Sequence, residues 1–149
     1  MKIVRCTEED YETLAGIWER SVMATHSFLK IEDFNEIKGA LIPDYFSNVD
    51  LYAIADNGVY VGFLGLSSTT IEMLFIDNDH RGLGYGSYLI EFAKQRGATK
   101  VDVNEQNPSA LNFYKTKGFH VIARDETDDA GRSYPIIHLY YPSVPVKWN

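Results

Sequence analysis

The stretch DHRGLGYGSYL, residues 79–89, places three glycines at alternating positions, Gly82, Gly84 and Gly86, directly before an apolar helical pattern. Glycine lets the backbone approach a ligand closely and adopt conformations that other residues avoid. The first turn of a helix also offers unpaired N–H groups and the positive end of the helix dipole. The stretch therefore predicts either a turn that binds an anion such as pyrophosphate or a strand-to-helix turn without a ligand.

Two well-known phosphate-binding turns fit these glycines poorly. A P-loop is excluded because no Lys-Ser/Thr pair follows them. A dinucleotide-binding turn could use Gly82, Gly84 and, about 20 residues later, the acidic Asp102, but Ser87 stands where its third glycine belongs. The loop DNDHR also separates Ile76, at the end of an apolar run, from the first glycine. A nucleotide-binding oxidoreductase is therefore a disfavoured alternative.

Strand-like and helix-like patterns alternate along the rest of the chain. Helices are predicted after the N-cap Thr7, over residues 31–46 with a stop at Pro43, over 86–97, and from Pro108 to just before Gly118. Strands are predicted at residues 2–6, 51–56, 60–68, 70–77, 99–104, 120–125 and 135–141. The order β-α-α-β-β-β-α-β-α-β-β predicts an α/β protein with an α+β mixed sheet and helices packed on it.

Local signals support several of these boundaries. Asn57-Gly58 is the favoured two-residue hairpin turn, so the strands around it and the following one are expected to form an antiparallel meander. Gly97 and Gly118 are expected just past the ends of two helices. The helix over residues 86–97 is expected to carry Tyr88, Leu89, Phe92 and Ala93 on one apolar face. Residues 142–149 read as a tail without periodicity.

Composition narrows the classes of protein that fit. The 149 residues are expected to form a single domain, residues 1–149, and no apolar run approaches the roughly 20 residues that a membrane span needs. A net charge of −7 disfavours nucleic acid as a partner and suits a cationic amine. Cys6, the only cysteine, cannot form an internal disulfide. The start MKIVRCTEED has no signal-type apolar stretch, so a cytoplasmic location is expected.

The run Arg81-Gly82-Leu83-Gly84-Tyr85-Gly86 resembles the Arg/Gln-x-x-Gly-x-Gly/Ala signature of the GNAT superfamily of acyl-CoA-dependent N-acetyltransferases at every defined position. The resemblance continues upstream in EMLFIDNDHRG and downstream in NPSALNFYKTKGF, and covers most of residues 70–119. SVMATHSFL, LFIDNDHRG and VNEQN look like a small bacterial subgroup of uncharacterised acetyltransferases. The resemblance implies the GNAT fold, in which a central, mostly antiparallel sheet splays apart between its fourth and fifth strands.

The resemblance also implies how acetyl-CoA, the acyl donor, would bind. Main-chain groups of the fourth strand would pair with the amides of the pantetheine arm, and main-chain N–H groups of the glycine turn would hold the pyrophosphate. Arg81 would supply positive charge, Asn107 would contact the coenzyme arm as well as cap its helix, and Asn104 would orient groups where the strands part. The main-chain contacts would come from Leu74, Phe75, Ile76, Gly82, Leu83, Gly84, Tyr85, Gly86 and Ser87.

Tyr114 has the clearest chemical role under this resemblance, which places it beside the thioester sulfur. Acetyl transfer to an amine expels a thiolate, and a phenol with a pKa of about 10 can protonate it. The structural alternative is an aromatic anchor of the helix against the sheet, which describes Phe113 better than Tyr114.

Two residues are candidates for removing the proton from the acceptor amine. Glu72 is expected on the same strand face as Leu74 and Ile76, where burial would raise its pKa, and His26 ends the first helix. Glu72 could instead make a structural hydrogen bond, and solvent could take the proton. His80 and His138 are expected to be a loop and a strand residue, and no pair has metal-ligand spacing, so no metal is expected.

The sequence thus predicts an N-acetyltransferase that moves the acetyl group of acetyl-CoA to a primary amine of a small molecule, peptide or protein. The alternative is a catalytically silent acyl-CoA-binding or sensing module, against which Tyr114 weighs. Acidic clusters at residues 8–12 and 125–129 could attract a cationic acceptor or simply be solvated. No membrane partner is expected, and a homodimer stays open.

Overall fold

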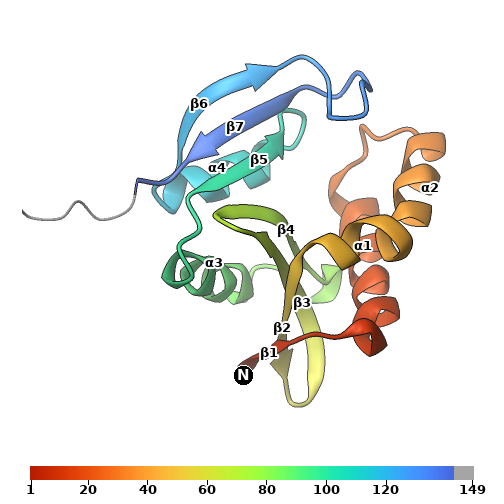
Figure 1. The fold of residues 1–149 in the computed structure, drawn as a ribbon, viewed down its shortest axis with the longest axis vertical. Helices are drawn as coiled ribbons and strands as arrows, with labels where there is room; N and C mark the ends of the chain where they lie inside the picture. The colour runs from red at the N-terminus through yellow and green to blue at the C-terminus, as the bar shows by residue number, and fades with distance from the viewer. Residues whose placement is uncertain (143–149) are drawn as a thin grey trace, which may run out of the picture.

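The structure, a computed structural model, describes residues 1–142, so the predicted tail beyond Pro142 lies outside the described residues. Its helices are α1 (Tyr11–Thr25), α2 (Ile31–Ala40), α3 (Tyr85–Gln95) and α4 (Pro108–Thr116). Its strands are β1 (Lys2–Arg5), β2 (Asp50–Asp56), β3 (Val59–Ser67), β4 (Thr70–Ile76), β5 (Lys100–Asn104), β6 (His120–Asp125) and β7 (Ile136–Tyr140). The predicted order of strands and long helices is confirmed (Figure 1).

The strands form one sheet in the order β1-β2-β3-β4-β5-β7-β6. The predicted antiparallel meander is present, because β2 pairs with β3 and β3 with β4 in antiparallel fashion. Asn57 (φ 53°) and Gly58 (φ 77°) both adopt positive φ between β2 and β3, as a type I′ hairpin turn requires. The sequence pattern therefore identified this hairpin correctly.

The sheet splays apart in its middle. β4 and β5 run parallel and pair only at Thr70 with Lys100 and at Ile71 with Val101. Beyond those pairs the strands diverge, while β5 continues along its other edge in antiparallel pairing with β7 (Figure 1). The predicted GNAT fold with its splay between the fourth and fifth strands is confirmed.

Two apolar cores lie on opposite faces of the meander. On one face, α1 and α2 pack together through Trp18 and Phe34, whose stacked rings lie 5.3 Å apart, and cover Phe63 of β3. On the other face, Leu89 of α3 packs into a larger core that continues to Tyr114 of α4. Within residues 1–142, no helix is long and apolar enough to cross a bilayer.

Two local predictions about helices are corrected. Pro43 does not stop the helical course: α2 ends at Ala40, and a π-helical turn over Leu41–Tyr45 carries the chain past the proline. Proline lacks a backbone N–H, so the wider turn replaces the regular hydrogen bonds instead of ending the helix. Tyr88 is 56% exposed rather than buried, because α3 turns Tyr85, Leu89, Ile90 and Ala93 toward the core.

Candidate active site

A cleft of about 560 Å³ lies where β4 and β5 diverge. Its walls come from β4, β5, the end of α1, the glycine turn before α3 and the first two turns of α4. Among the described residues, β4 has no strand partner along the edge from Met73 to Ile76 that faces β5. The main-chain N–H and C=O groups on that edge can therefore form hydrogen bonds with the amides of an extended ligand, as they would with a neighbouring strand.

The glycine turn closes one end of this cleft and suits an anion. Gly82 (φ 77°) and Gly84 (φ 89°) are left-handed, and a Cβ added to either would meet no atom within 4 Å. Gly84 is the N-cap of α3, and Tyr88 makes the helix's first backbone hydrogen bond, to the Gly84 carbonyl at 3.2 Å. The N–H groups ahead of Tyr88 are therefore open to a ligand. The Tyr85 hydroxyl donates to Asp56 of β2 and anchors the turn.

Tyr114 of α4 also lines the cleft, although its side chain is only 6% exposed. Its ring packs edge-to-face against Phe113 and Phe119, with centroids 5.2 and 5.6 Å away. Asn107 begins α4, where its side-chain oxygen accepts a hydrogen bond of 3.3 Å from the Ala110 amide. Burial raises the pKa of Tyr114 above that of a free phenol, so the hydroxyl keeps its proton near neutral pH.

Glu72 lies in the cleft but not as strand alternation predicted. A β-bulge in β4 pairs Met73 with Gly65 and Ile71 with Leu66, leaving Glu72 as the extra residue. Ile71 consequently joins the core of Leu74 and Ile76, whereas Glu72 is exposed at the cleft. The prediction that Glu72 shares the inward face of Leu74 and Ile76 is therefore wrong.

The pKa of Glu72 is nevertheless raised, as the sequence predicts. Partial desolvation raises the pKa of Glu72, and the neighbouring carboxylates of Asp102 and Asp129 raise it further. Asp102 also lines the cleft and lies 2.6 Å from Nδ1 of His138, whose Nε2 lies 2.6 Å from Asp125. These hydrogen bonds raise the pKa of His138, which favours its charged form beside the carboxylates.

His26 lines the cleft from the C-terminal end of α1. Its Nδ1 lies 2.7 Å from the Thr25 hydroxyl, and its ring lies 5.2 Å from that of Phe28. Burial, followed by the positive charge of Arg81, lowers the pKa of His26 to about 4. The ring is therefore neutral at physiological pH.

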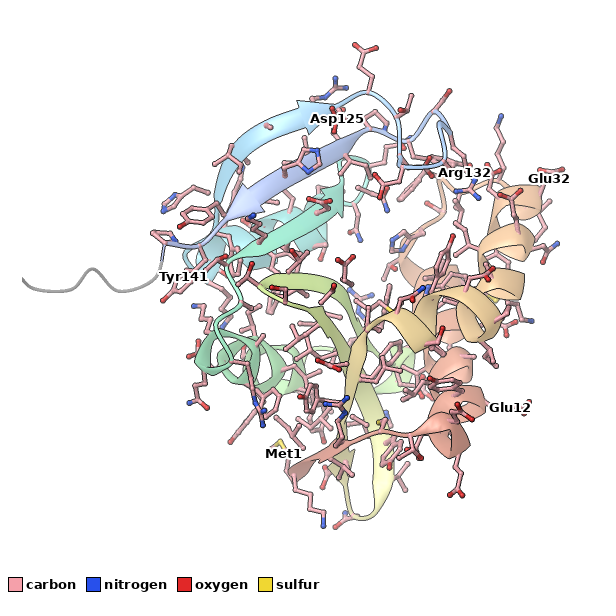
Figure 2. The ribbon with its side chains drawn as sticks, in the orientation of Figure 1. Met1, Glu12, Glu32, Asp125, Arg132 and Tyr141 are labelled. Carbon is pink, nitrogen blue, oxygen red and sulfur yellow. The ribbon has the colours of Figure 1, made fainter. Side chains whose placement is uncertain are left out.

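A bridge of polar side chains joins α2 to the loop between β6 and β7. Arg132 makes ion pairs with Asp128 (3.0 Å), with Asp33 (3.6 Å) and with Glu36. The Tyr134 hydroxyl donates to Asp33 and accepts a hydrogen bond of 3.0 Å from the Lys30 amide. Figure 2 shows Arg132 beside the end of α2 that carries Glu32. The bridge thus connects segments from the two sides of the splay.

The cleft gathers the predicted site residues with one exception. Leu83 does not line it, and its side chain is 64% exposed. The residues that do line it are His26, Glu72, Leu74, Phe75, Ile76, Arg81, Gly82, Gly84, Tyr85, Gly86, Ser87, Asn104, Asn107 and Tyr114. His80, predicted as a plain loop residue, lines it as well, from a 3-10 turn.

Among the polar residues that line the cleft, sequence reasoning also did not select Ser21, Thr25, Asp102 and Ser109 as site residues. For Asp102 a signal was present, because it alternates with the buried Val101 and Val103 and so must face away from their core. Ser21 and Thr25 lie one helical turn apart near the end of α1, which by itself does not distinguish a cleft from a helix surface.

The sheet splayed between β4 and β5, the left-handed glycine turn at a helix N-terminus and the buried tyrosine in the cleft wall are the features that the resemblance to GNAT acetyltransferases implies. The chain belongs to the GNAT family: residues 22–134 match the model described as "Acetyltransferase (GNAT) domain". The protein is an N-acetyltransferase, as predicted from the sequence.

Relatives cover nearly the whole chain. A protein of Salmonella typhimurium named peptidyl-lysine N-acetyltransferase YjaB is 41% identical over 144 residues, 95% of this chain and 99% of the relative. The solution structure of apo-form YjaB from Escherichia coli superposes with a TM-score of 0.85 at 38% identity, covering 96% of this chain and 98% of that one.

A more distant structure carries the coenzyme. It is the PaiA N-acetyltransferase from Thermoplasma acidophilum in complex with coenzyme A, with a TM-score of 0.67 at 20% identity, covering 94% of this chain and 98% of that one. At that identity the match shows a shared fold.

Proposed function

We propose that the protein transfers the acetyl group of acetyl-CoA to the side-chain amine of a lysine in a peptide or protein. The observation that carries the proposal is the cleft across the β4–β5 splay, with the glycine turn at one end and Tyr114, Glu72 and His26 in its walls. The similarity to a peptidyl-lysine N-acetyltransferase supports a peptide acceptor, and the carboxylates in the cleft suit a cationic one.

The donor would lie along β4. Main-chain groups of Leu74, Phe75 and Ile76 would pair with the pantetheine amides, while the N–H groups from Gly82 to Ser87 would bind the pyrophosphate with Arg81 nearby. Asn104 and Asn107 would contact the coenzyme arm from β5 and α4. This arrangement would bring the thioester to the part of the cleft that Tyr114 lines.

The reaction then needs three proton transfers in the site, after which Glu72 releases its proton to solvent. The acceptor ammonium first loses a proton to Glu72, directly or through water, and the free amine attacks the thioester carbonyl carbon. The C–N bond forms and the C–S bond breaks, so that the thiolate takes the Tyr114 hydroxyl proton. The attacking nitrogen releases a second proton, which returns to Tyr114 through water. The products are the amide and coenzyme A with a free thiol.

The direct test is an amine screen with product identification by mass spectrometry. It compares a peptide with one internal lysine, the same peptide with Nε-acetyl-lysine, a peptide with only a free N-terminus, and a polyamine. We expect one acetyl group on the first peptide and none on the second. Transfer to the polyamine alone would overturn the peptide acceptor.

A thermal-shift measurement with acetyl-CoA distinguishes the silent-module alternative. At 100 times its dissociation constant, acetyl-CoA should stabilise the fold by about 2.7 kcal/mol, and NAD should not. Stabilisation by acetyl-CoA without acetylation of any amine would favour a module that binds acyl-CoA and does not turn over.

The pH dependence of kcat/KM should identify the base. Because the pKa of Glu72 is raised above 4.5, rates that depend on its carboxylate fall as pH drops through that raised value. A limb set by His26 would instead lie near pH 4, where that side chain becomes charged. We expect Glu72→Gln to remove the acidic limb and to lower kcat/KM at pH 8 about tenfold.

Asp102→Asn is the matched variant for this profile. It removes a carboxylate that raises the pKa of Glu72, so the acidic limb should move to lower pH, whatever the height of the plateau. If neither Glu72→Gln nor His26→Ala removes the acidic limb, the limb reports the deprotonation of the acceptor amine itself.

A further inference from the structure

The last turn of α1 holds a chain of two hydrogen bonds that ends at His26. The Thr25 hydroxyl oxygen lies 2.8 Å from the Ser21 carbonyl oxygen and 2.7 Å from His26 Nδ1. Ser21 is buried, and Ser21, Thr25 and His26 all line the cleft. None of the steps proposed above uses Thr25.

Counting protons along this chain determines which nitrogen of His26 carries hydrogen. The Ser21 carbonyl can only accept, so the single hydroxyl proton of Thr25 is donated to it. The Thr25 oxygen must then accept from His26, which places the ring proton on Nδ1. In a neutral imidazole the other nitrogen, Nε2, bears a lone pair.

The surroundings hold the ring in this state. Phe28 lies 5.2 Å from the His26 ring and itself contacts Tyr134 at 6.0 Å, so aromatic groups support it on one side. Arg81 of the glycine turn disfavours a second proton on the ring. The other titratable groups that line the cleft are Glu72 of β4, His80 of the turn before α3, Tyr85 of α3, Asp102 of β5 and Tyr114 of α4.

We propose that Thr25 is a positioning residue, which holds His26 as the Nδ1–H tautomer so that Nε2 accepts a hydrogen bond from the acceptor amine. This inference rests on the proposed function for its substrate. The opposite tautomer would present an N–H, which can only donate to the amine lone pair and would occupy the electrons needed for attack. With one amine hydrogen held by Nε2, the nitrogen lone pair is oriented toward the thioester carbonyl.

Thr25→Val and Thr25→Ser form the test pair. Valine keeps the shape of threonine without the hydroxyl, and serine keeps the hydroxyl. We expect Thr25→Val to lower kcat/KM for the acceptor about tenfold with an unchanged KM for acetyl-CoA, whereas Thr25→Ser stays within about twofold of the parent. Ser27→Ala, at an exposed neighbour outside the cleft lining, should match the parent.

Nitrogen-15 NMR of the His26 ring gives a readout that does not depend on the acceptor. The parent and Thr25→Ser should show the Nδ1–H pattern, and Thr25→Val, or Thr25→Ala if the valine variant misfolds, should shift toward Nε2–H. An Nε2–H parent, or equal kinetic loss in Thr25→Ser and Thr25→Val, would overturn the proposal. An Nδ1–H parent that acetylates no lysine peptide would overturn the proposed function and leave the tautomer assignment standing.

Discussion

Replacing Tyr114 by phenylalanine is expected to lower kcat about 10²-fold and to leave acetyl-CoA binding unchanged. The ring would keep its contacts with Phe113 and Phe119, so the fold and the cleft wall remain. The lost hydroxyl would act only as the C–S bond breaks, and an interaction made only in the transition state affects kcat rather than ground-state binding. Because burial raises the pKa of Tyr114, the proton is present at the pH of the assay.

Steady-state kinetics with the lysine peptide and calorimetric titration with coenzyme A measure the two quantities separately. Tyr88→Phe is the matched control, since it makes the same change at an exposed position of α3 outside the cleft lining. Full kcat with a raised KM for acetyl-CoA in Tyr114→Phe would make Tyr114 a binding or packing residue.

Replacing Gly84 by valine is expected to weaken coenzyme A binding by 10- to 100-fold, the loss that one or two charge-assisted hydrogen bonds correspond to. The added side chain would stand at the N-terminus of α3, where main-chain N–H groups are proposed to bind the pyrophosphate. It would also strain the backbone, because Gly84 has φ 89°.

The variant Gly97→Val is a control that distinguishes the effect of backbone strain from a loss of coenzyme A binding. Gly97 has φ 88°, almost that of Gly84, and a Cβ at either position would meet no atom within 4 Å. Both variants should therefore lose similar stability, about 1–2 kcal/mol, in thermal unfolding. Only Gly84→Val should lose affinity in the calorimetric titration, and equal affinity in the two variants would remove the glycine turn from the pyrophosphate site.

Features fixed by neighbouring residues could be predicted from the sequence. The hairpin at Asn57-Gly58 follows from two residues that tolerate positive φ, and the start of α4 follows from Asn107 and Pro108. The glycine turn could be recognised because glycines close together in the sequence provide the backbone freedom that such a turn requires. The splay, in contrast, depended on the family resemblance, since no local pattern indicates where a sheet parts.

Features made by distant residues could not be predicted. The bulge at Glu72 depends on how β4 meets Gly65 and Leu66 of β3, and it interrupts the alternation on which the prediction rested. The Arg132–Glu36 pair joins residues 96 positions apart, and no local pattern near either residue indicates that they are in contact. The role of Thr25 could not be predicted for a different reason: Thr25 is adjacent to His26, but only the structure shows that both line the cleft.

The two-position contact between β4 and β5 has a consequence for local stability. Segments joined by few backbone hydrogen bonds open in separate cooperative units, and the opening free energy of each is measured by amide hydrogen exchange. The meander β1–β4 and the unit formed by β5–β7 with α4 should thus exchange with different protection. A coenzyme lying along β4 and touching Asn107 and Tyr114 would bind both units. Its binding free energy would then raise the hydrogen-exchange protection of both units together, so the acyl donor would help to hold the two parts of the sheet together.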